Sequence, residues 1–212
     1  AKFESDSLPK VLSEIKKLDC KILVILEKND IETINAIKEK QVKIIYQTLK
    51  GYGNAIREGI KNVETEFMCI FNADGSFDPK YLSEKLDLCK NKYELVFSSR
   101  YLKNAGSDDD TLLTKIGNFF FSKFGNIFFN LKLTDILYTY IVGRTKSFKR
   151  LNLVSNDFCL CIEIPIKAKR LNLSYVEIAS YERKRIAGFK KVSEFKDGLK
   201  ILIYMVKLTF VK

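Results

Sequence analysis

The sequence predicts a single α/β domain built on a doubly wound parallel sheet. Short apolar segments alternate with amphipathic ones along the first hundred residues, and this β-α alternation is typical of parallel sheets. The chain has 212 residues, 46% of them apolar, which is enough for one sizeable core. Since no stretch has the composition of a long linker, we expect one domain over residues 1–212.

The N-terminal half is expected to alternate helices and strands almost from its first residue. The first helix follows a serine cap and contains Pro9 near its start, and its apolar residues recur at helical spacing. The strands are short apolar runs, and a glycine turn precedes the third helix. The expected segments are helix 7–18, strand 21–26, helix 30–40, strand 42–46, helix 53–63 and strand 67–71.

The C-terminal half is expected to be richer in helices. Pro79 begins the first of them, and six phenylalanines give the helix over 113–131 an unusually wide apolar face. Loops are indicated where Gly, Asn, Asp or basic residues gather. The expected segments are helix 79–91, strand 93–98, loop 101–112, helix 113–131, a short irregular stretch 135–148, helix 158–171, strand 174–178, loop 183–191 and helix 193–212.

The stretch in which we expect the chemistry begins where the apolar run 67–71 ends. Asn72 and Asp74 follow this run directly, and Gly75 and Pro79 mark a turn. In open α/β sheets, ligands bind beyond the carboxyl ends of the strands. Asn72 and Asp74 are therefore the first candidate site residues.

The charge of the chain indicates the kind of ligand. Thirty-seven Lys and Arg residues against 26 Asp and Glu give a formal charge of +11, which favours an anionic partner such as phosphate, nucleic acid or a lipid surface. The chain contains no histidine. This excludes histidine acid–base catalysis and histidine metal ligands, so a bound metal would be held by oxygen atoms.

The cysteines and the hydropathy indicate the compartment. The five cysteines are odd in number and form no C-x-x-C motif, so free thiols in a reducing compartment are expected. No run of eighteen apolar residues is present, so no membrane-spanning helix is expected within these residues. We expect a cytoplasmic protein.

Several landmarks, taken in order, resemble those of a known family. They are the turn Asn72-Ala-Asp74-Gly-Ser-Phe-Asp78-Pro79, Ser99-Arg100, a long helix, Asp135, Glu163 and Arg185-Ile-Ala-Gly188-Phe-Lys-Lys191. Their order and spacing resemble the family-two glycosyltransferases of the GT-A fold, in particular dolichyl-phosphate mannose synthase and related polyprenyl-phosphate sugar transferases. The resemblance covers nearly the whole chain. It implies a nucleotide-binding part over about residues 1–100 and an acceptor-facing part over about 101–212.

The resemblance implies transfer of a sugar from a nucleotide-diphosphate donor to a polyprenyl phosphate or a glycan hydroxyl, by an inverting single displacement. A Mg²⁺ or Mn²⁺ ion would stabilise the leaving diphosphate. The metal motif of the family is Asp-x-Asp. Asn72 replaces its first acid here, so Asp74 and Asn72 are the predicted metal ligands and donor-binding residues.

The strand end before Lys28 departs from the family in the same way. In the family, a pair of acids at this strand end contacts the base and the ribose. Leu26 stands in place of the first acid here and Glu27 in place of the second, so Glu27 remains a donor-binding candidate. These two departures leave an alternative open, a catalytically degenerate module that binds a nucleotide sugar or glycan. Gly53 resembles the glycine turn near the nucleotide, where backbone N–H groups approach an anion, although an ordinary strand-to-helix turn would look the same.

Further candidates come from the landmarks that follow. Arg100, Arg185, Lys190 and Lys191 supply cations for a diphosphate or a lipid phosphate, or form a solvated basic surface. Asp135 lies where the family has an acid beside the acceptor, and would act as general base for a hydroxyl acceptor, whereas a phosphate needs none. Asp135 and Arg100 are thus the predicted catalytic residues. Glu163 would position a loop or line the acceptor site.

The two most apolar helices, over 113–131 and 193–212, bear on partners. They could lie in a membrane interface with lysines toward lipid phosphates, at the cytoplasmic face, or pack on each other or on a partner subunit. Aromatic residues lie in apolar helical runs rather than on a basic strand face, which argues against a nucleic-acid ligand.

The N-terminal residues match the family only in part. Family members begin with a central strand followed by a turn, and Lys2-Phe3-Glu4-Ser5 matches the turn alone. The first central strand is thus missing from this sequence. We expect about five apolar residues upstream of Ala1 to supply it.

Overall fold

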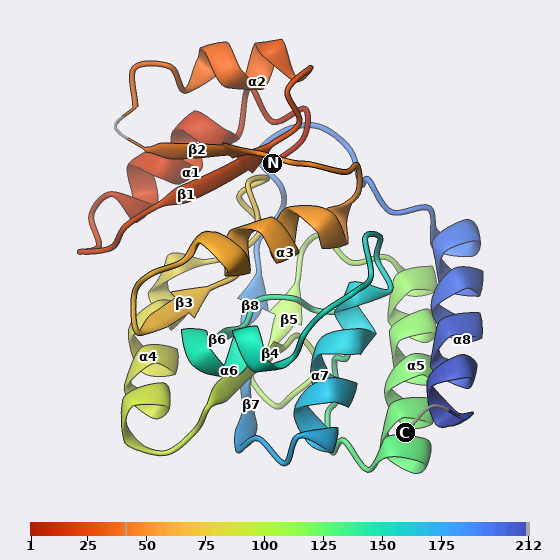
Figure 1. Ribbon diagram of the computed structural model, residues 1–212. Coiled ribbons are helices and arrows are strands. Elements are labelled where there is room, and N and C mark those ends of the chain that lie inside the picture. The colour runs from red at the N-terminus through yellow and green to blue at the C-terminus, as the bar shows by residue number, and fades with distance from the viewer. Residues whose placement is uncertain (41, 211–212) are drawn as a thin grey trace.

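The structure is a computed structural model that describes residues 1–40 and 42–210. It has the α/β architecture expected from the sequence (Figure 1). The central sheet has the strand order β3-β6-β4-β7, and two further two-stranded sheets pair β1 with β2 and β5 with β8. The strands are β1 (Leu23–Leu26), β2 (Lys43–Tyr46), β3 (Phe67–Cys69), β4 (Leu95–Ser99), β5 (Gly106–Ser107), β6 (Val142–Arg144), β7 (Tyr175–Ala179) and β8 (Tyr181–Glu182).

Helices flank these sheets. Three of the strand pairs, β1 with β2, β4 with β7 and β5 with β8, are parallel, whereas β6 is antiparallel to both of its neighbours. The helices are α1 (Leu8–Ile15), α2 (Ile31–Ala36), α3 (Tyr52–Asn62), the 3-10 turn η1 (Pro79–Tyr81), α4 (Leu82–Asn91), α5 (Leu112–Phe129), α6 (Thr145–Arg150), α7 (Leu160–Arg170) and α8 (Glu194–Phe210).

Most segments lie where the sequence predicted them, but the prediction of an irregular stretch over 135–148 was wrong. It contains β6 and the start of α6. A side chain at Gly143 in β6 would clash, because its Cβ would lie 2.5 Å from Leu95 Cδ2 and 2.8 Å from the carbonyl oxygen of Glu94. A three-residue strand with a glycine at its centre gives almost no periodic signal. The expected loop over 101–112 likewise contains β5, and the last two residues of the expected final helix lie outside the described residues.

Two of the apolar clusters lie on either side of the candidate functional site. The larger one joins β4 to α7, α5 and α8, and α7 is buried on nearly every side. The smaller one joins α1, β1 and Ile37. No described helix is long and apolar enough to cross a membrane.

The two clusters are separated by a gap between β1 and β3. Within residues 1–40 and 42–210, β1 pairs with β2 and β3 pairs with β6, and no pairing joins β1 to β3. Both strands instead line one large cavity. The location of this gap is compatible with the expected additional central strand, which remains a prediction.

A buried lysine makes the stability of this fold depend on pH. Lys85 of α4 is fully buried, and its Nζ lies 2.8 Å from the centroid of the Tyr140 ring and donates to the carbonyl oxygen of Tyr140 at 3.2 Å. No carboxylate pairs with it in any described ion pair. Burial lowers the pKa of Lys85 to about 7.

We expect the free energy of unfolding of the wild type to rise between pH 7 and pH 8.5 relative to that of Lys85→Met. The unfolded chain holds the Lys85 proton up to about pH 10.4, whereas the folded chain releases it from about pH 7. The unfolded state therefore binds more protons, and stability rises by up to about 1.4 kcal/mol per pH unit. Urea unfolding of the wild type and of Lys85→Met at both pH values tests this, since the variant should lose the contribution of Lys85. Parallel pH curves for the two proteins would contradict it.

Candidate functional site

The site residues gather around a cavity of about 1740 Å³ between the β1–β2 pair and the central sheet. Residues from both halves of the chain line it, from the ends of β1 and β3 to the loop that precedes α8. Seven of the nine predicted site residues line the cavity. They are Glu27, Asn72, Asp74, Arg100, Arg185, Lys190 and Lys191. Gly53 and Asp135 are not among its lining residues.

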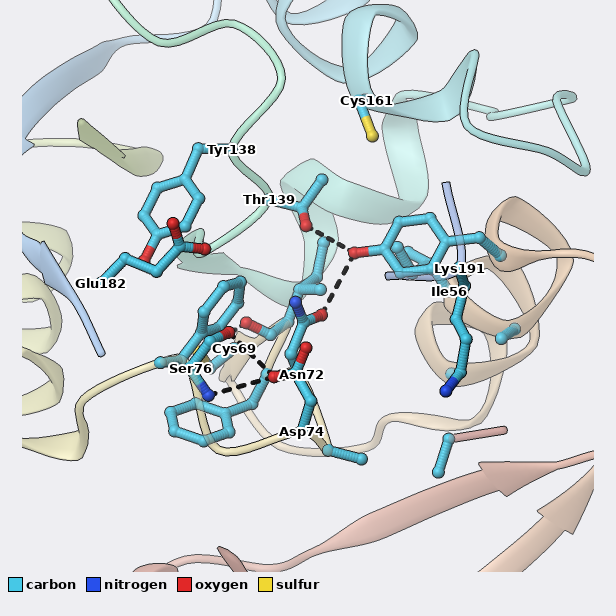
Figure 2. A pocket seen from close by; sticks show the side chains of 18 of the residues that line it. Ile56, Cys69, Asn72, Asp74, Ser76, Tyr138, Thr139, Cys161, Glu182 and Lys191 are labelled. Atoms are coloured by element: carbon cyan, nitrogen blue, oxygen red, sulfur yellow. Dashed lines mark hydrogen bonds between the residues drawn. The ribbon is translucent and has the colours of Figure 1, made fainter. Parts of the chain in front are cut away.

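Asn72 and Asp74 lie in the turn beyond β3, as the strand-end rule predicts (Figure 2). Asp74 Oδ1 accepts hydrogen bonds from the backbone N–H of Ser76 at 3.0 Å and from its hydroxyl at 2.8 Å. Gly75, at a φ of +83°, lets the chain turn back between them. The turn thus fixes one carboxylate oxygen of Asp74, a residue that lines the cavity.

Tyr52 is a site residue that the sequence reasoning missed. Its hydroxyl donates to Asn72 Oδ1 at 3.3 Å and accepts a hydrogen bond from Thr139 Oγ1 at 2.5 Å, and its ring stacks on Phe158 at 5.0 Å. Burial raises the pKa of the Tyr52 hydroxyl, so it remains a neutral donor. The sequence pattern pointed to the neighbouring glycines of the turn, and no local pattern indicates a role for this tyrosine.

The loop after β8 closes over the Asp74 turn. Arg183 donates to the carbonyl oxygens of Gly75 and Phe77 at 3.1 and 2.9 Å, and the N–H of Ile186 donates to the carbonyl oxygen of Asp74 at 2.8 Å. These bonds hold the loop against the turn although the two are more than a hundred residues apart in the chain. They place the basic segment 185–191 at the cavity.

Arg185 is the cation nearest the acidic turn. Its NH1 lies 3.8 Å from Asp74 Oδ2, and its guanidinium forms two hydrogen bonds with Asp109, at 3.0 and 2.5 Å. The hydrogen bonds to Asp109 raise the pKa of Arg185. Lys191 lies 3.4 Å from Glu4 and is half-buried. The cavity therefore has fixed positive charge next to the Asp74 carboxylate.

Arg100 lies at the end of β4 within a buried ion network. Asp135 accepts two hydrogen bonds from its guanidinium, at 2.7 and 2.9 Å, and Glu182 accepts a third at 3.1 Å. The ring of Tyr138 lies 4.5 Å from the guanidinium carbon. Although burial opposes the charge, Asp135 and Glu182 raise the pKa of Arg100 well above its usual value.

Asp135 lies behind Arg100, away from the cavity wall. Its side chain is 0% exposed, and its Oδ2 also accepts the backbone N–H of Arg100 at 3.1 Å. The position predicted for an acid beside the acceptor is therefore occupied by a carboxylate that holds Arg100 in place. Thr134 and the backbone N–H of Asp135 are in turn held by Glu177.

The glycine turn at Gly53 packs against protein. A Cβ on Gly53 would lie 2.5 Å from the carbonyl oxygen of Ser155, and the N–H of Asn54 donates to the carbonyl oxygen of Asn156 at 3.1 Å. Glu163, fully buried on α7, accepts the N–H groups of Val154 and Ser155 at 2.9 Å each and so positions this loop. Gly53 thus allows close packing, while Gly51 and Tyr52 of the same turn reach the cavity.

Glu27 lies at the end of β1 and forms an ion pair with Lys2. It is 8% exposed, and Oε1 lies 2.9 Å from Lys2 Nζ. Nearby, the carboxylate of Asp30 accepts the N–H of Phe3 at 2.7 Å. Residues 1–4 are thereby held across the end of β1, at the wall of the cavity opposite the central sheet.

The residues around Asp74 fit a hard divalent ion that takes most of its ligands from elsewhere. Among residues 1–40 and 42–210, no three His, Cys, Asp or Glu side chains form a metal cluster. Asp74 supplies one carboxylate oxygen, and the amide oxygen of Asn72 is bonded to Tyr52. Mg²⁺ is commonly held by one or two carboxylates with phosphate oxygens of the substrate, and this donor set matches that pattern.

Known proteins resemble this chain in sequence and in fold. The family model described as Glycosyl transferase family 2 matches residues 1–151. The dolichyl-phosphate hexose transferase of Haloferax volcanii is 22% identical over 207 residues, which are 97% of this chain and 89% of that protein.

Solved structures resemble the fold over the whole described chain. Glucosyl-3-phosphoglycerate synthase from Mycobacterium tuberculosis, in complex with Mn²⁺, UDP-glucose and phosphoglyceric acid, has a TM-score of 0.77 at 12% identity, over 100% of this chain and 78% of that one. Mannosyl-3-phosphoglycerate synthase from Rubrobacter xylanophilus has a TM-score of 0.73 at 12% identity, over 98% and 71%. The match confirms the GT-A fold that the sequence predicted.

Proposed function

Because the chain belongs to glycosyl transferase family 2, we propose that it moves a sugar from a nucleotide-diphosphate donor to a polyprenyl phosphate. The observation that carries this proposal is the joining of an acidic turn and a basic loop in one cavity. Asp74 lies on one side, and Arg185, Lys190 and Lys191 line the same space. A donor diphosphate and an acceptor phosphate both need positive charge around them.

The acids at the cavity favour a phosphate acceptor over a glycan hydroxyl. A hydroxyl needs a base to take its proton, whereas a phosphate is already anionic. Among the acids that line the cavity, Asp109 is bonded to Arg185, Glu182 to Arg100 and Ser107, and Asp110 to Tyr101 and Thr114. Asp135, which does not line the cavity, is bonded to Arg100. With these carboxylates engaged, a phosphate oxygen is the better nucleophile for this site.

The proposed reaction is a single displacement. A phosphate oxygen of the acceptor attacks the anomeric carbon of the sugar and forms the new C–O bond. The bond from that carbon to the diphosphate oxygen breaks, the electron pair leaves with the nucleoside diphosphate, and the configuration inverts. Mg²⁺ or Mn²⁺ held by Asp74, with Asn72 beside it, would neutralise the charge on the leaving diphosphate. Arg100 and Arg185 would hold the phosphates in place.

The curated relative and the solved structures support parts of this assignment. The relative is a dolichyl-phosphate hexose transferase, and one of the structures contains Mn²⁺ with a nucleotide sugar. Five free cysteines agree with a reducing compartment. We infer that the protein works at the cytoplasmic face of a membrane, where a lipid acceptor would be found. The alternative is that a partner subunit covers the apolar helices α5 and α8.

The direct test is sugar transfer with a panel of UDP- and GDP-sugars, polyprenyl phosphate in detergent, and either Mn²⁺ or a chelator. We expect a lipid-linked sugar with at least one donor, formed only with metal, since Asp74 cannot hold the diphosphate without a cation. Mass spectrometry of the lipid phase measures it. Donor binding without any product would instead favour the degenerate binding module, to which Asn72 and Leu26 point.

A further inference from the structure

We propose that a groove between the N-terminal halves of α5 and α8 receives the hydrocarbon chain of the acceptor, which passes the small residues Gly117 and Gly198. This inference rests on the proposed function, which requires a phosphorylated acceptor. It adds a site for the apolar part of that acceptor. Figure 1 shows α5 and α8 lying side by side at one edge of the molecule.

The two helices begin together at the cavity. Thr111 caps α5, and its hydroxyl donates to Glu194 Oε1 at the first residue of α8 at 3.1 Å. Toward their C-terminal ends, α8 packs into the core through buried residues such as Met205 and Leu208. Near their N-terminal ends the two helices line the cavity instead.

Both glycines lie beside open space. A Cβ on Gly117 or on Gly198 would meet no described atom within 4 Å beyond its own helix turn and its chain neighbours. Both residues line the cavity. Glycine weakens a helix interior relative to alanine, so neither is there for helix stability. Open space in the cavity is the property that the two positions share.

The lining of the groove matches a hydrocarbon chain. It includes Leu113, Ile116, Phe121 and Leu202, and aromatic and aliphatic side chains on the same helix ends are exposed, with Phe195 at 80%. A branched, unsaturated chain can cover such side chains and remove them from water. An apolar face of this kind on a small domain marks a site for a hydrophobic partner.

The groove is continuous with the donor site, and the charges are arranged for a lipid phosphate. Arg185, Lys190 and Lys191 line the same cavity as Gly117 and Gly198. A phosphate at these cations would therefore leave its chain free to run between α5 and α8. A small soluble phosphate would contact the cations alone. Binding in the groove therefore distinguishes a lipid phosphate from a small soluble phosphate.

The test measures binding without requiring turnover. Calorimetry with farnesyl phosphate, farnesol and inorganic phosphate compares the wild type with Gly117→Phe, Gly198→Phe and their alanine counterparts. We expect farnesyl phosphate to bind more tightly than inorganic phosphate. The phenylalanine variants should lose at least about tenfold of this affinity, as two or more CH₂ groups leave apolar contact. The alanine variants should bind as the wild type does, because the groove stays open.

Ile203→Phe is the matched control, because Ile203 is exposed on α8 and does not line the cavity. It should bind as the wild type does. Equal affinity of farnesyl phosphate in the wild type and in both glycine-to-phenylalanine variants, each shown to be folded by circular dichroism, would overturn the groove. A loss in Ile203→Phe of the same size would move the lipid to the outer face. Failure of sugar transfer with normal farnesyl phosphate binding would count against the proposed function alone.

Discussion

Replacing Asp74 by asparagine is expected to reduce metal-dependent sugar transfer by about a hundredfold to a thousandfold while leaving the protein folded. Asp74 supplies the only carboxylate of the turn beyond β3 that lines the described cavity. Asparagine keeps an oxygen that can accept the two hydrogen bonds from Ser76, at 3.0 and 2.8 Å, but removes the charge. The substitution should therefore weaken metal binding and the stabilisation of the leaving diphosphate, and it should leave the conformation of the turn unchanged.

Steady-state kinetics over a range of Mn²⁺ concentrations measures this effect, and thermal unfolding monitors the fold. Asp78→Asn is the matched control, because Asp78 caps the turn η1 through the N–H of Lys80 at 3.0 Å and does not line the cavity. It should keep the wild-type rate. An Asp74→Asn protein with the same rate and the same response to Mn²⁺ as the wild type would show that the metal, if one acts, is held elsewhere.

The sequence predicted the cavity residues that follow a strand. Asn72, Asp74 and Arg100 each lie just beyond or at the carboxyl end of an apolar run, and strand ends of one sheet meet at one edge. Lys190 and Lys191 were found by their charge in a glycine-containing loop. Such local patterns survive folding because a strand end fixes where its next side chain lies.

Features that depend on packing between distant segments were not predictable in this way. Nothing in the sequence around Asp135 indicates that it is buried behind Arg100. Likewise, nothing around Gly53 indicates that a carbonyl oxygen from the loop 154–157 lies where its side chain would be. The strand β6 is short and depends on Gly143 fitting between β3 and β4. Tyr52 joins the site through Asn72 and Thr139, which lie 20 and 87 residues away.

Arg100→Met is expected to lower the free energy of unfolding by about 3–5 kcal/mol and to abolish sugar transfer. The substitution removes the guanidinium but leaves Asp135 with a side chain that is 0% exposed and Glu182 at 9%. These two carboxylates, and Asp110 at 3.9 Å from Arg100 NH1, would then lack their cation. Burial already raises the pKa of Glu182, and the loss of the Arg100 guanidinium would raise it further. Urea unfolding measures the stability, and the sugar-transfer assay the activity.

A second substitution separates the structural role of Arg100 from its role at the substrate. Arg100→Met combined with Asp135→Asn has one buried charge fewer to leave unpaired, so it should recover part of the lost stability. Activity should not recover, because Arg100 lines the cavity and supplies a cation that neither new side chain replaces. Arg100→Lys retains a positive charge but cannot form the two parallel bonds to Asp135, and it should fall between the wild type and Arg100→Met in both measurements. If the double variant regained activity together with stability, Arg100 would act only by holding the loop after β4, and the phosphate would be bound by Arg185, Lys190 and Lys191.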